Sequence, residues 1–280
     1  STSQYNIGAD LGLLNNRIFL MANYYLSQST DLLFNQPVSA VSGTSTILTN
    51  LRNSKVQNQG IDLQLDARVI QTSDFRLNLS GNFSLNRNKV LDLGGANTIL
   101  TNGAERSYLT HITQEGQPIG MFYGFKVKGM VRESDMANIA EDNANYNAAT
   151  QTYTAGYKIK GPARSTASSN SLKPGDLYFE DTNGDGVISD SDMQPLFDNT
   201  NPFLATGITL NLAYKNWSLN TNINARFGGK VFYDSRSRIA PSATRNIISL
   251  WQDRWTPENP TEGRYPRFDD PSLVRNSDFW

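Results

Sequence analysis

The stretch YNIGADLGL, residues 5–13, decides the fold class, because apolar side chains alternate through it with polar or small ones. A period of two over this length is typical of a β-strand with one apolar face and one polar face. A strand that crosses a bilayer at a tilt needs about 9–11 residues, whereas strands of soluble proteins average about 5–6. The stretch therefore predicts a wall strand of a membrane β-barrel. Its apolar members are Tyr5, Ile7, Ala9, Leu11 and Leu13.

The same alternation recurs in five further stretches, at 17–27, 61–69, 75–85, 204–214 and 217–227. An Arg or Lys that faces the middle of a bilayer costs about 2–4 kcal/mol. In these stretches the charged side chains all fall on the polar face, which favours lipid contact for the other face. The alternative is a soluble sandwich sheet with one buried face, which usually has shorter strands. We predict an all-β fold, with about six antiparallel wall strands of a larger transmembrane barrel. The charged residues are Asp10, Asp62, Asp66, Arg68, Arg76 and Arg226.

The connections alternate between tight and long. Residues 15–16, 71–74 and 215–216 form tight turns, whereas 28–58, 87–202 and the segment from 228 onward are long. Outer-membrane barrels have short periplasmic turns and long external loops. We therefore expect 1–280 to be part of one barrel, with 87–202 as a long extracellular excursion and 228–280 as an extracellular loop. Within these segments we expect a strand at 121–131, a helical turn at 133–141 and a short helix at 244–254.

Composition excludes several classes of function. With 25 basic and 26 acidic residues, the chain has no general attraction for nucleic acid. It contains no cysteine and a single histidine, His111, so thiolate or multi-histidine metal sites and a Ser–His–Asp triad are not expected. We see no paired acid–base arrangement and no phosphate-binding glycine loop. We therefore predict that the chain is not an enzyme and that its strand carboxylates are solvated.

The stretch DTNGDGVISDSD, residues 181–192, matches a calcium-binding loop. Such a loop needs hard oxygen ligands that converge on one ion, and a glycine at its sixth position for a sharp turn. Gly186 holds that position. An Asp in place of the usual Glu at the twelfth position has a shorter reach. We predict a structural calcium site; a metal-free turn rich in Asn, Asp and Gly remains the alternative. The predicted ligands are Asp181, Asn183, Asp185, the Val187 carbonyl and Asp192.

Several aromatic side chains lie in the segments that we expect outside the membrane. Aromatic faces suit stacking against sugars or peptides, and packing within loops is the alternative role. The candidates for substrate contact are Tyr123, Phe125, Trp251 and Tyr265.

Five phrases together resemble the SusC/RagA family of TonB-dependent outer-membrane transporters, which import glycans or peptides. They are QYNIGADLGLLNNRIFLMANYY at 4–25, NQGIDLQL at 58–65, EGQPIGMFYGFKVKG at 115–129, GDLYFEDTNGDGVISDSD at 175–192 and RWTPENP at 254–260. The resemblance implies a 22-stranded barrel with an internal plug. We therefore expect an interior piece of a longer polypeptide, without the plug and the TonB box.

The resemblance also implies a function and its partners. It predicts active import of oligosaccharide or peptide nutrients across the outer membrane of a Gram-negative bacterium. A SusD-like surface lipoprotein would act as a lid, and a TonB complex would supply energy through the missing N-terminal region. Outer-membrane lipid would surround the barrel. The alternative is a calcium-stiffened surface module that has a structural or adhesive role without transport.

Overall fold

The computed structural model describes residues 1–37, 41, 43, 46–95, 97–103, 106–165, 170, 172–197, 200–233, 249–260, 263–267 and 277–279. The chain divides into two compact units. We call the first the sheet unit; it comprises Ser1–Thr101, Ile112–Met121 and Phe197–Val231. We call the second the loop unit; it comprises Asn102–His111, Phe122–Leu196 and Phe232–Trp280.

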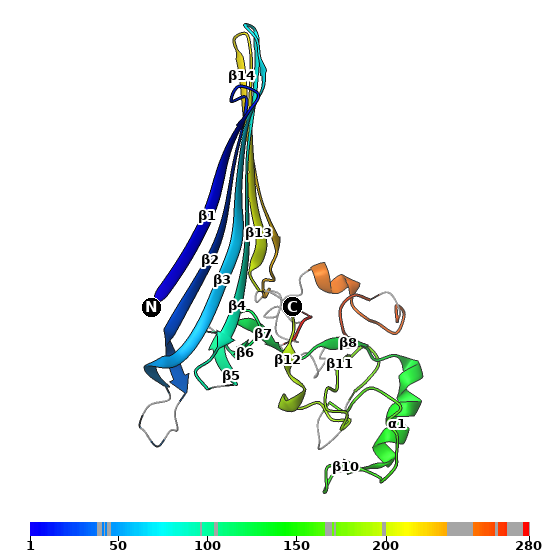
Figure 1. The fold of residues 1–280 in the computed structure, drawn as a ribbon. Helices are drawn as coiled ribbons and strands as arrows, with labels where there is room; N and C mark the ends of the chain where they lie inside the picture. The colour runs from blue at the N-terminus through cyan, green and yellow to red at the C-terminus, as the bar shows by residue number, and fades with distance from the viewer. Residues whose placement is uncertain are drawn as a thin grey trace. The chain divides into compact units, whose positions relative to one another are not determined.

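Six long strands build the sheet unit, in the order β1-β2-β3-β4-β13-β14 (Figure 1). All five neighbouring pairs are antiparallel. The predicted all-β class and the six wall strands are thus confirmed, and among the described residues β1 and β14 form the two edges of the sheet. The strands are β1 (Thr2–Leu13), β2 (Ile18–Pro37), β3 (Thr46–Gln71), β4 (Phe75–Asp92), β13 (Pro202–Tyr214) and β14 (Trp217–Gly228).

The register places apolar residues side by side across the whole sheet. We call a set of directly paired residues across neighbouring strands a row. One row runs from β1 to β14 and contains no charged or polar side chain. Rows on this face alternate with rows on the opposite face, where the polar side chains gather. The apolar face is open: Ile7 is 72% exposed and Ile223 is 59% exposed. The row consists of Leu11, Leu20, Leu65, Gly81, Ile208 and Ile223.

This apolar face forms a band, and aromatic residues lie at both ends of the band along the strands. Phe75, Tyr214 and Trp217 lie beside the tight turns, where the rings of Phe75 and Tyr214 are 6.3 Å apart. Tyr24 and Phe227 lie in the last apolar row at the other end. The band spans Phe75–Leu85 on β4 and Leu204–Tyr214 on β13, which matches the length predicted for a bilayer crossing.

Two details of the strand predictions are wrong. Val69 does not belong to the apolar rows, because a bulge between Arg68 and Ile70 lets Ile70 pair with Leu77 instead. The predicted long connection at 28–58 is also wrong, because β2 and β3 stay paired as far as Pro37 and Thr46. Alternation of apolar residues stops near residue 27, whereas backbone pairing continues, so the pattern could not show the extension.

The extended end of the sheet unit contains its small hydrophobic core. Val56, Val90, Leu93 and Ile99 are buried together. Leu32 and Leu51, which pair with each other beyond a bulge at Asp31, pack against this cluster. This core fixes the ends of β2, β3 and β4 beyond the apolar band. The short strand β5 (Thr98–Gly103) supplies Ile99.

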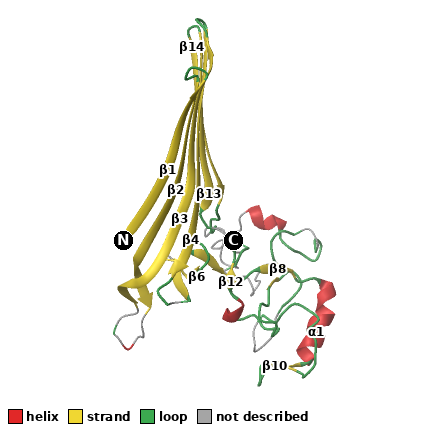
Figure 2. Cartoon of the chain, in the orientation of Figure 1, coloured by secondary structure: helices red, strands yellow, loops and turns green. Residues whose placement is uncertain are grey.

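The other elements are short and irregular (Figure 2). The predicted strand at 121–131 is present as two pieces, β7 and β8, and the predicted helical turn at 133–141 is confirmed as η2 and α1. Of the predicted helix at 244–254, residues 244–248 lie outside the described residues, and 249–253 form a 3₁₀ turn, η4. The bounds are β6 (Arg106–Gln114), β7 (Met121–Gly124), β8 (Val127–Met130), η2 (Glu133–Asp135), α1 (Met136–Ala144), β9 (Tyr146–Asn147), β10 (Thr152–Tyr153), β11 (Leu177–Phe179), η3 (Asp190–Asp192), β12 (Gln194–Pro195) and η4 (Ser249–Asp253).

Antiparallel pairs organise the loop unit. β8 pairs with β11, β7 with β12, and β9 with β10. Val131, Ile139 and Leu172 form a small core under α1. Within the described residues, no helix has both the length and the apolar composition that a membrane span requires.

Candidate functional site

The polar face of the sheet unit forms a hollow of about 1080 Å³. Asp10, Asp62 and Arg226 line it, together with amide side chains from β2, β3, β4 and β14. Strand alternation puts these groups on one face, because each lies one residue away from an apolar partner on the other face. The hollow therefore offers many neutral hydrogen-bonding groups and few charges.

Hydrogen bonds tie this polar face together across the strands. Ser84 on β4 donates to Asp62 on β3 over 2.6 Å, while Gln64 donates to Asp66 over 2.9 Å along β3 itself. Tyr25 donates across the sheet to Asn86 over 3.1 Å. Such a surface can bind polar, uncharged groups or water.

In the loop unit, residues 181–192 form a compact turn held by side-chain oxygens. Asp181 accepts hydrogen bonds from the Gly184 and Gly186 backbone N–H groups, each over 2.7 Å. Asn183 accepts from Asp185 N–H over 2.9 Å, and Asp185 accepts from Val187 N–H over 2.8 Å. The first, third and fifth loop positions thus present their oxygens on the inside of one turn, as a calcium loop requires.

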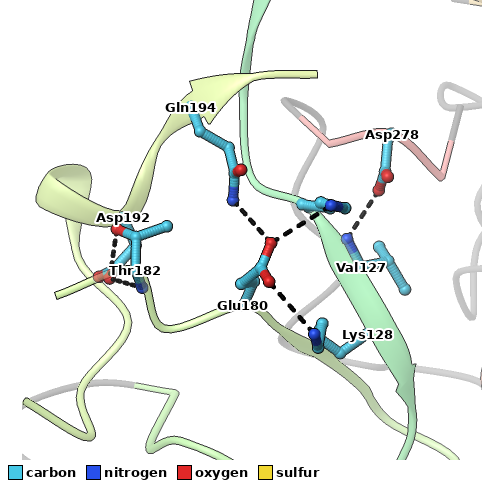
Figure 3. Close-up of polar contacts among 8 residues, drawn as sticks. Val127, Lys128, Glu180, Thr182, Asp192, Gln194 and Asp278 are labelled. Atoms are coloured by element: carbon cyan, nitrogen blue, oxygen red, sulfur yellow. Dashed lines mark hydrogen bonds and ion pairs between the residues drawn. The ribbon is translucent and has the colours of Figure 1, made fainter. Parts of the chain in front are cut away.

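Asp192 is placed differently. Its side chain is fully buried, and one carboxylate oxygen accepts the N–H group of Thr182 over 2.9 Å (Figure 3). The other oxygen accepts the N–H group of Ser189 over 2.8 Å. Together with Ser189 it caps η3. The twelfth position therefore acts as a cap, and the side-chain oxygens of the first, third and fifth positions accept hydrogen bonds within the turn. Across the described residues, no three His, Asp or Glu side chains form a preassembled metal cluster.

The turn is joined to the segment before it by backbone pairing. Arg164 N–H donates to the Gly186 carbonyl over 2.7 Å, and Ile188 N–H donates to the Arg164 carbonyl over 2.9 Å. The Arg164 guanidinium lies 3.9 Å from the centre of the Tyr146 ring. Gly186 has φ +81°, and a Cβ there would meet the Tyr153 ring at 2.6 Å. Glycine is thus required at this position for both conformation and space.

Glu180 precedes this turn and is a centre of polar contacts (Figure 3). Its carboxylate accepts from Gln194 over 3.0 Å and lies 3.2 Å from the Lys128 ammonium and 3.5 Å from that of Lys126. The hydrogen bond from Gln194, with the help of Lys128, holds the pKa of Glu180 below its ordinary value. The carboxylate therefore stays charged and connects β8, β11 and β12.

A second contact on β8 comes from a distant part of the sequence. Asp278 accepts a hydrogen bond from Val127 N–H over 2.7 Å, and its own N–H donates to the Phe125 carbonyl over 3.2 Å (Figure 3). Burial raises the pKa of the Asp278 carboxyl above its ordinary value. Residues 277–279 thus attach to the strand pair that carries Glu180.

The predicted substrate aromatics divide into two pairs. Trp251 is fully buried and Tyr265 is 8% exposed, and their rings pack 5.2 Å apart. A ring without exposed surface has no face for a ligand, so both are corrected to packing residues. Tyr123 and Phe125 are half-buried; Tyr123 pairs with Pro195, and Phe125 packs 5.7 Å from Phe179. Substrate contact by these two stays a prediction.

Three contacts that shape the loop unit could not be predicted from the sequence. These are the Glu180 centre, the Arg164–Tyr146 stack and a buried pair in which Arg267 Nε lies 2.5 Å from Asp176 Oδ1. Each joins residues whose spacing is set by irregular loops, so no local pattern could reveal it. The single histidine, His111, packs on Phe122 with the ring centres 5.0 Å apart, and burial lowers its pKa.

Comparisons with known proteins give a consistent result. The chain is 28% identical over 262 residues to TonB-dependent receptor P3 of Formosa agariphila, covering 92% of this chain and 23% of that protein. It is 26% identical over 248 residues to TonB-dependent receptor SusC of Bacteroides thetaiotaomicron, covering 89% and 21%. The RagAB peptide transporter structure has the same fold, with a TM-score of 0.67 at 18% identity over 97% of this chain and 26% of that one. No family model matches the chain.

The predicted resemblance to a SusC/RagA-like TonB-dependent transporter is confirmed. The SusC/RagA-like chain spans about a quarter of the length of the relatives it matches. The names of these relatives describe receptors and transporters, in agreement with the prediction that the chain is not an enzyme.

Proposed function

We propose that the SusC/RagA-like chain forms part of an outer-membrane barrel that imports nutrients. The observation that carries this proposal is the exposed apolar band of the sheet unit. Eleven residues of β4, from Phe75 to Leu85, advance about 33 Å along the strand. At a tilt of about 40° this covers about 25 Å, the height of the apolar band of outer-membrane barrels. Water would oppose exposure of such a band, whereas lipid stabilises it.

The turns indicate an orientation. Short turns at 14–17 and 215–216 lie at one end of the band, and β2 and β3 extend beyond its other end. Outer-membrane barrels have their short turns in the periplasm. We therefore assign the turn end to the periplasm and the extended end, with the segments 87–202 and 228–280, to the cell exterior.

The partners and the cargo follow from the relatives. RagAB is a peptide transporter, and SusC is a TonB-dependent receptor. By analogy, we assign oligosaccharide or peptide cargo, a SusD-like lipoprotein as the lid and TonB as the energy source. The polar hollow with Asp62 and Arg226 suits such cargo, because its many neutral amide groups resemble the hydroxyl and amide groups of sugars and peptides in hydrogen-bonding character.

We also propose a calcium ion as a structural element of the turn at 181–192. Asp181, Asn183 and Asp185 present hard oxygens to the inside of the turn, and the Val187 carbonyl would complete that side. Asp192 would add a ligand only through the remaining lone pairs of its carboxylate, so we expect weaker affinity than in a loop that ends in Glu. The ion would stiffen the turn and the paired Arg164 segment.

One experiment tests the import proposal. The gene for the protein is deleted in its native host. The cells are then grown on a mixture of oligopeptides or on a mixture of oligosaccharides, and mass spectrometry follows the depletion of each mixture. We expect slower depletion of one class and recovery on complementation. Normal uptake of both classes, together with loss of surface adhesion, would favour the structural alternative.

A further inference from the structure

The apolar face of the sheet unit ends abruptly in a polar patch, which we call the boundary patch. It consists of Gln28, Gln57, Gln59, Arg87 and Lys89. Ile61 pairs with Leu85 in the last apolar row; in the next two rows on the same face, Gln59 pairs with Arg87 and Gln57 with Lys89. On β3 and β4 the change from an apolar to a cationic surface therefore occurs within one row, whereas Leu26 on β2 and Tyr5 on β1 continue the apolar face in the row of Gln59 and Arg87.

The distance of the patch from the edge of the apolar band places it at the headgroup layer, if the apolar band lies in lipid as proposed above. Arg87 is two residues beyond Leu85, which corresponds to about 7 Å along the strand and about 5 Å along the membrane normal at a tilt of about 40°. Lys89 is about 10 Å beyond the band by the same estimate. A bilayer has about 5–8 Å of headgroup layer on each side of its hydrocarbon core, so the Arg87 backbone lies within this layer, whereas the Lys89 backbone lies just beyond it and reaches it only through its long side chain.

Charge and hydrogen bonding agree with this depth. Arg87 and Lys89 are both exposed, and neither side chain has an ion-pair or hydrogen-bond partner among the described residues. The glutamines are linked to one another: Gln28 donates to Gln57 over 3.0 Å, and Gln57 donates to Gln59 over 3.1 Å. Two unpaired cations beside a row of amide groups match the phosphate and ester oxygens of a lipid headgroup.

The acidic side chains of these strands lie either beyond the patch or on the opposite face. Beyond the patch, Asp31 accepts a hydrogen bond from Asn53 N–H and Asp92 accepts one from Gly94 N–H. Asp10, Asp62 and Asp66 belong to rows on the opposite, polar face. The boundary patch thus has a positive field that these carboxylates do not neutralise across the sheet. We propose that Arg87 and Lys89 bind the phosphate group of an anionic lipid at the outer surface of the membrane. This inference rests on the proposed membrane position of the sheet unit.

The test uses local quenching by lipid. A fluorophore is attached at Leu85→Cys in the last apolar row; the chain contributes no cysteine of its own, and any cysteine elsewhere in the protein is replaced by Ser. The protein, as the cell makes it, is reconstituted in bilayers of phosphatidylcholine with brominated phosphatidylglycerol or brominated phosphatidylcholine. We expect stronger quenching by the anionic lipid, and a preference that falls about fivefold for each cation removed in Arg87→Gln and Lys89→Gln.

Matched controls separate the possible failures. The double variant Arg68→Gln/Arg226→Gln removes two cations from the opposite face and should keep the preference. The inference would be overturned if both lipids quench the unmodified protein equally. It would also be overturned if the control variant loses as much of the preference for anionic lipid as the Arg87 and Lys89 variants do. Both results would leave the membrane position intact. Absence of quenching by either lipid would instead overturn the membrane position.

A final arm separates lipid from soluble phosphate. Excess inorganic phosphate should leave the preference almost unchanged, because lipid headgroups surround the barrel at high local concentration. Loss of the preference at millimolar inorganic phosphate would show a site for a soluble anion and would overturn the assignment to lipid.

Discussion

Tyr25 on β2 lies across Gly60 on β3, and its hydroxyl donates to Asn86 on β4. A Cβ at Gly60 would come within 2.5 Å of the Tyr25 hydroxyl oxygen and closer still to the Leu85 carbonyl oxygen. One aromatic side chain thus fills the space left by a glycine and links three neighbouring strands just beyond the apolar band.

We predict that Gly60→Ala destabilises the sheet by about 1–3 kcal/mol, because Tyr25 and the β4 backbone must both move. The loss appears as a lower unfolding temperature of the purified protein in detergent. Gly8→Ala is the matched control, because a Cβ there meets its neighbours at 3.3 Å or more. Equal stability of both variants would contradict the tight packing at Gly60.

The apolar face gives a second prediction. Ile223 lies in the middle of the band, so Ile223→Arg should cost about 2–4 kcal/mol and reduce the amount of folded protein in outer membranes. Asn222→Arg places the same charge one residue away on the polar face and should be tolerated. Immunoblots of heat-modifiable protein compare the two; similar yields would indicate that lipid does not contact this face.

These strand faces could be predicted from the sequence because a period of two is a local signal. Ile61 and Leu65 alternate with Asp62 and Gln64, and the structure keeps that order. The bulge at Val69 was missed because one extra residue changes the face without changing composition. The extended pairing of β2 with β3 was missed because strands in water need no apolar alternation.

The calcium-type turn shows the limit of such motifs. Gly186 and the oxygens of Asp181 and Asp185 lie where the motif predicts, because adjacent backbone groups determine a tight turn. Asp192 forms a cap with Ser189, which a sequence cannot distinguish from a metal ligand. Trp251 was misassigned for a different reason: aromatic residues suit both stacking on cargo and burial, and only tertiary packing decides between them.

The buried ion pair in the loop unit gives a third prediction. The Asp176 side chain is fully buried and that of Arg267 is 22% exposed, so Arg267→Gln leaves a charge buried without a partner. We expect a loss of about 3–5 kcal/mol in local stability, measured by hydrogen exchange at Gly175 and Arg267 backbone amides. Arg264→Gln breaks an exposed pair with Asp253 and should cost less than about 1 kcal/mol.

Metal removal gives a fourth prediction. If calcium occupies the turn at 181–192, a chelator should increase protease cleavage between 181 and 192, and added calcium should reverse it. Asp185→Ala should abolish the difference, because it removes a central oxygen donor. Asp190→Ala is the control, since this exposed carboxylate is outside the predicted donor set. Cleavage that is independent of chelator in the unmodified protein would contradict the calcium proposal.

The attachment of Asp278 to β8 should depend on pH. Burial raises the pKa of Asp278 in the folded protein above the ordinary 3.8. The folded state therefore binds a proton more tightly than the unfolded state does. This contribution to stability is complete below pH 3.8 and is lost as pH rises through the raised pKa.

We therefore expect the free energy of unfolding of the loop unit, measured by hydrogen exchange and corrected for the intrinsic rate, to fall as pH rises through this window, because burial disfavours the charged carboxylate although the Val127 hydrogen bond favours it. Asp278→Asn keeps an oxygen acceptor for Val127 but cannot titrate, so its protection should be independent of pH. Glu180 and Lys126 lie near this carboxyl, and Glu180, whose pKa is below its ordinary value, raises the pKa of Asp278 while Lys126 lowers it. Unchanged pH dependence in Asp278→Asn would assign the effect to another group.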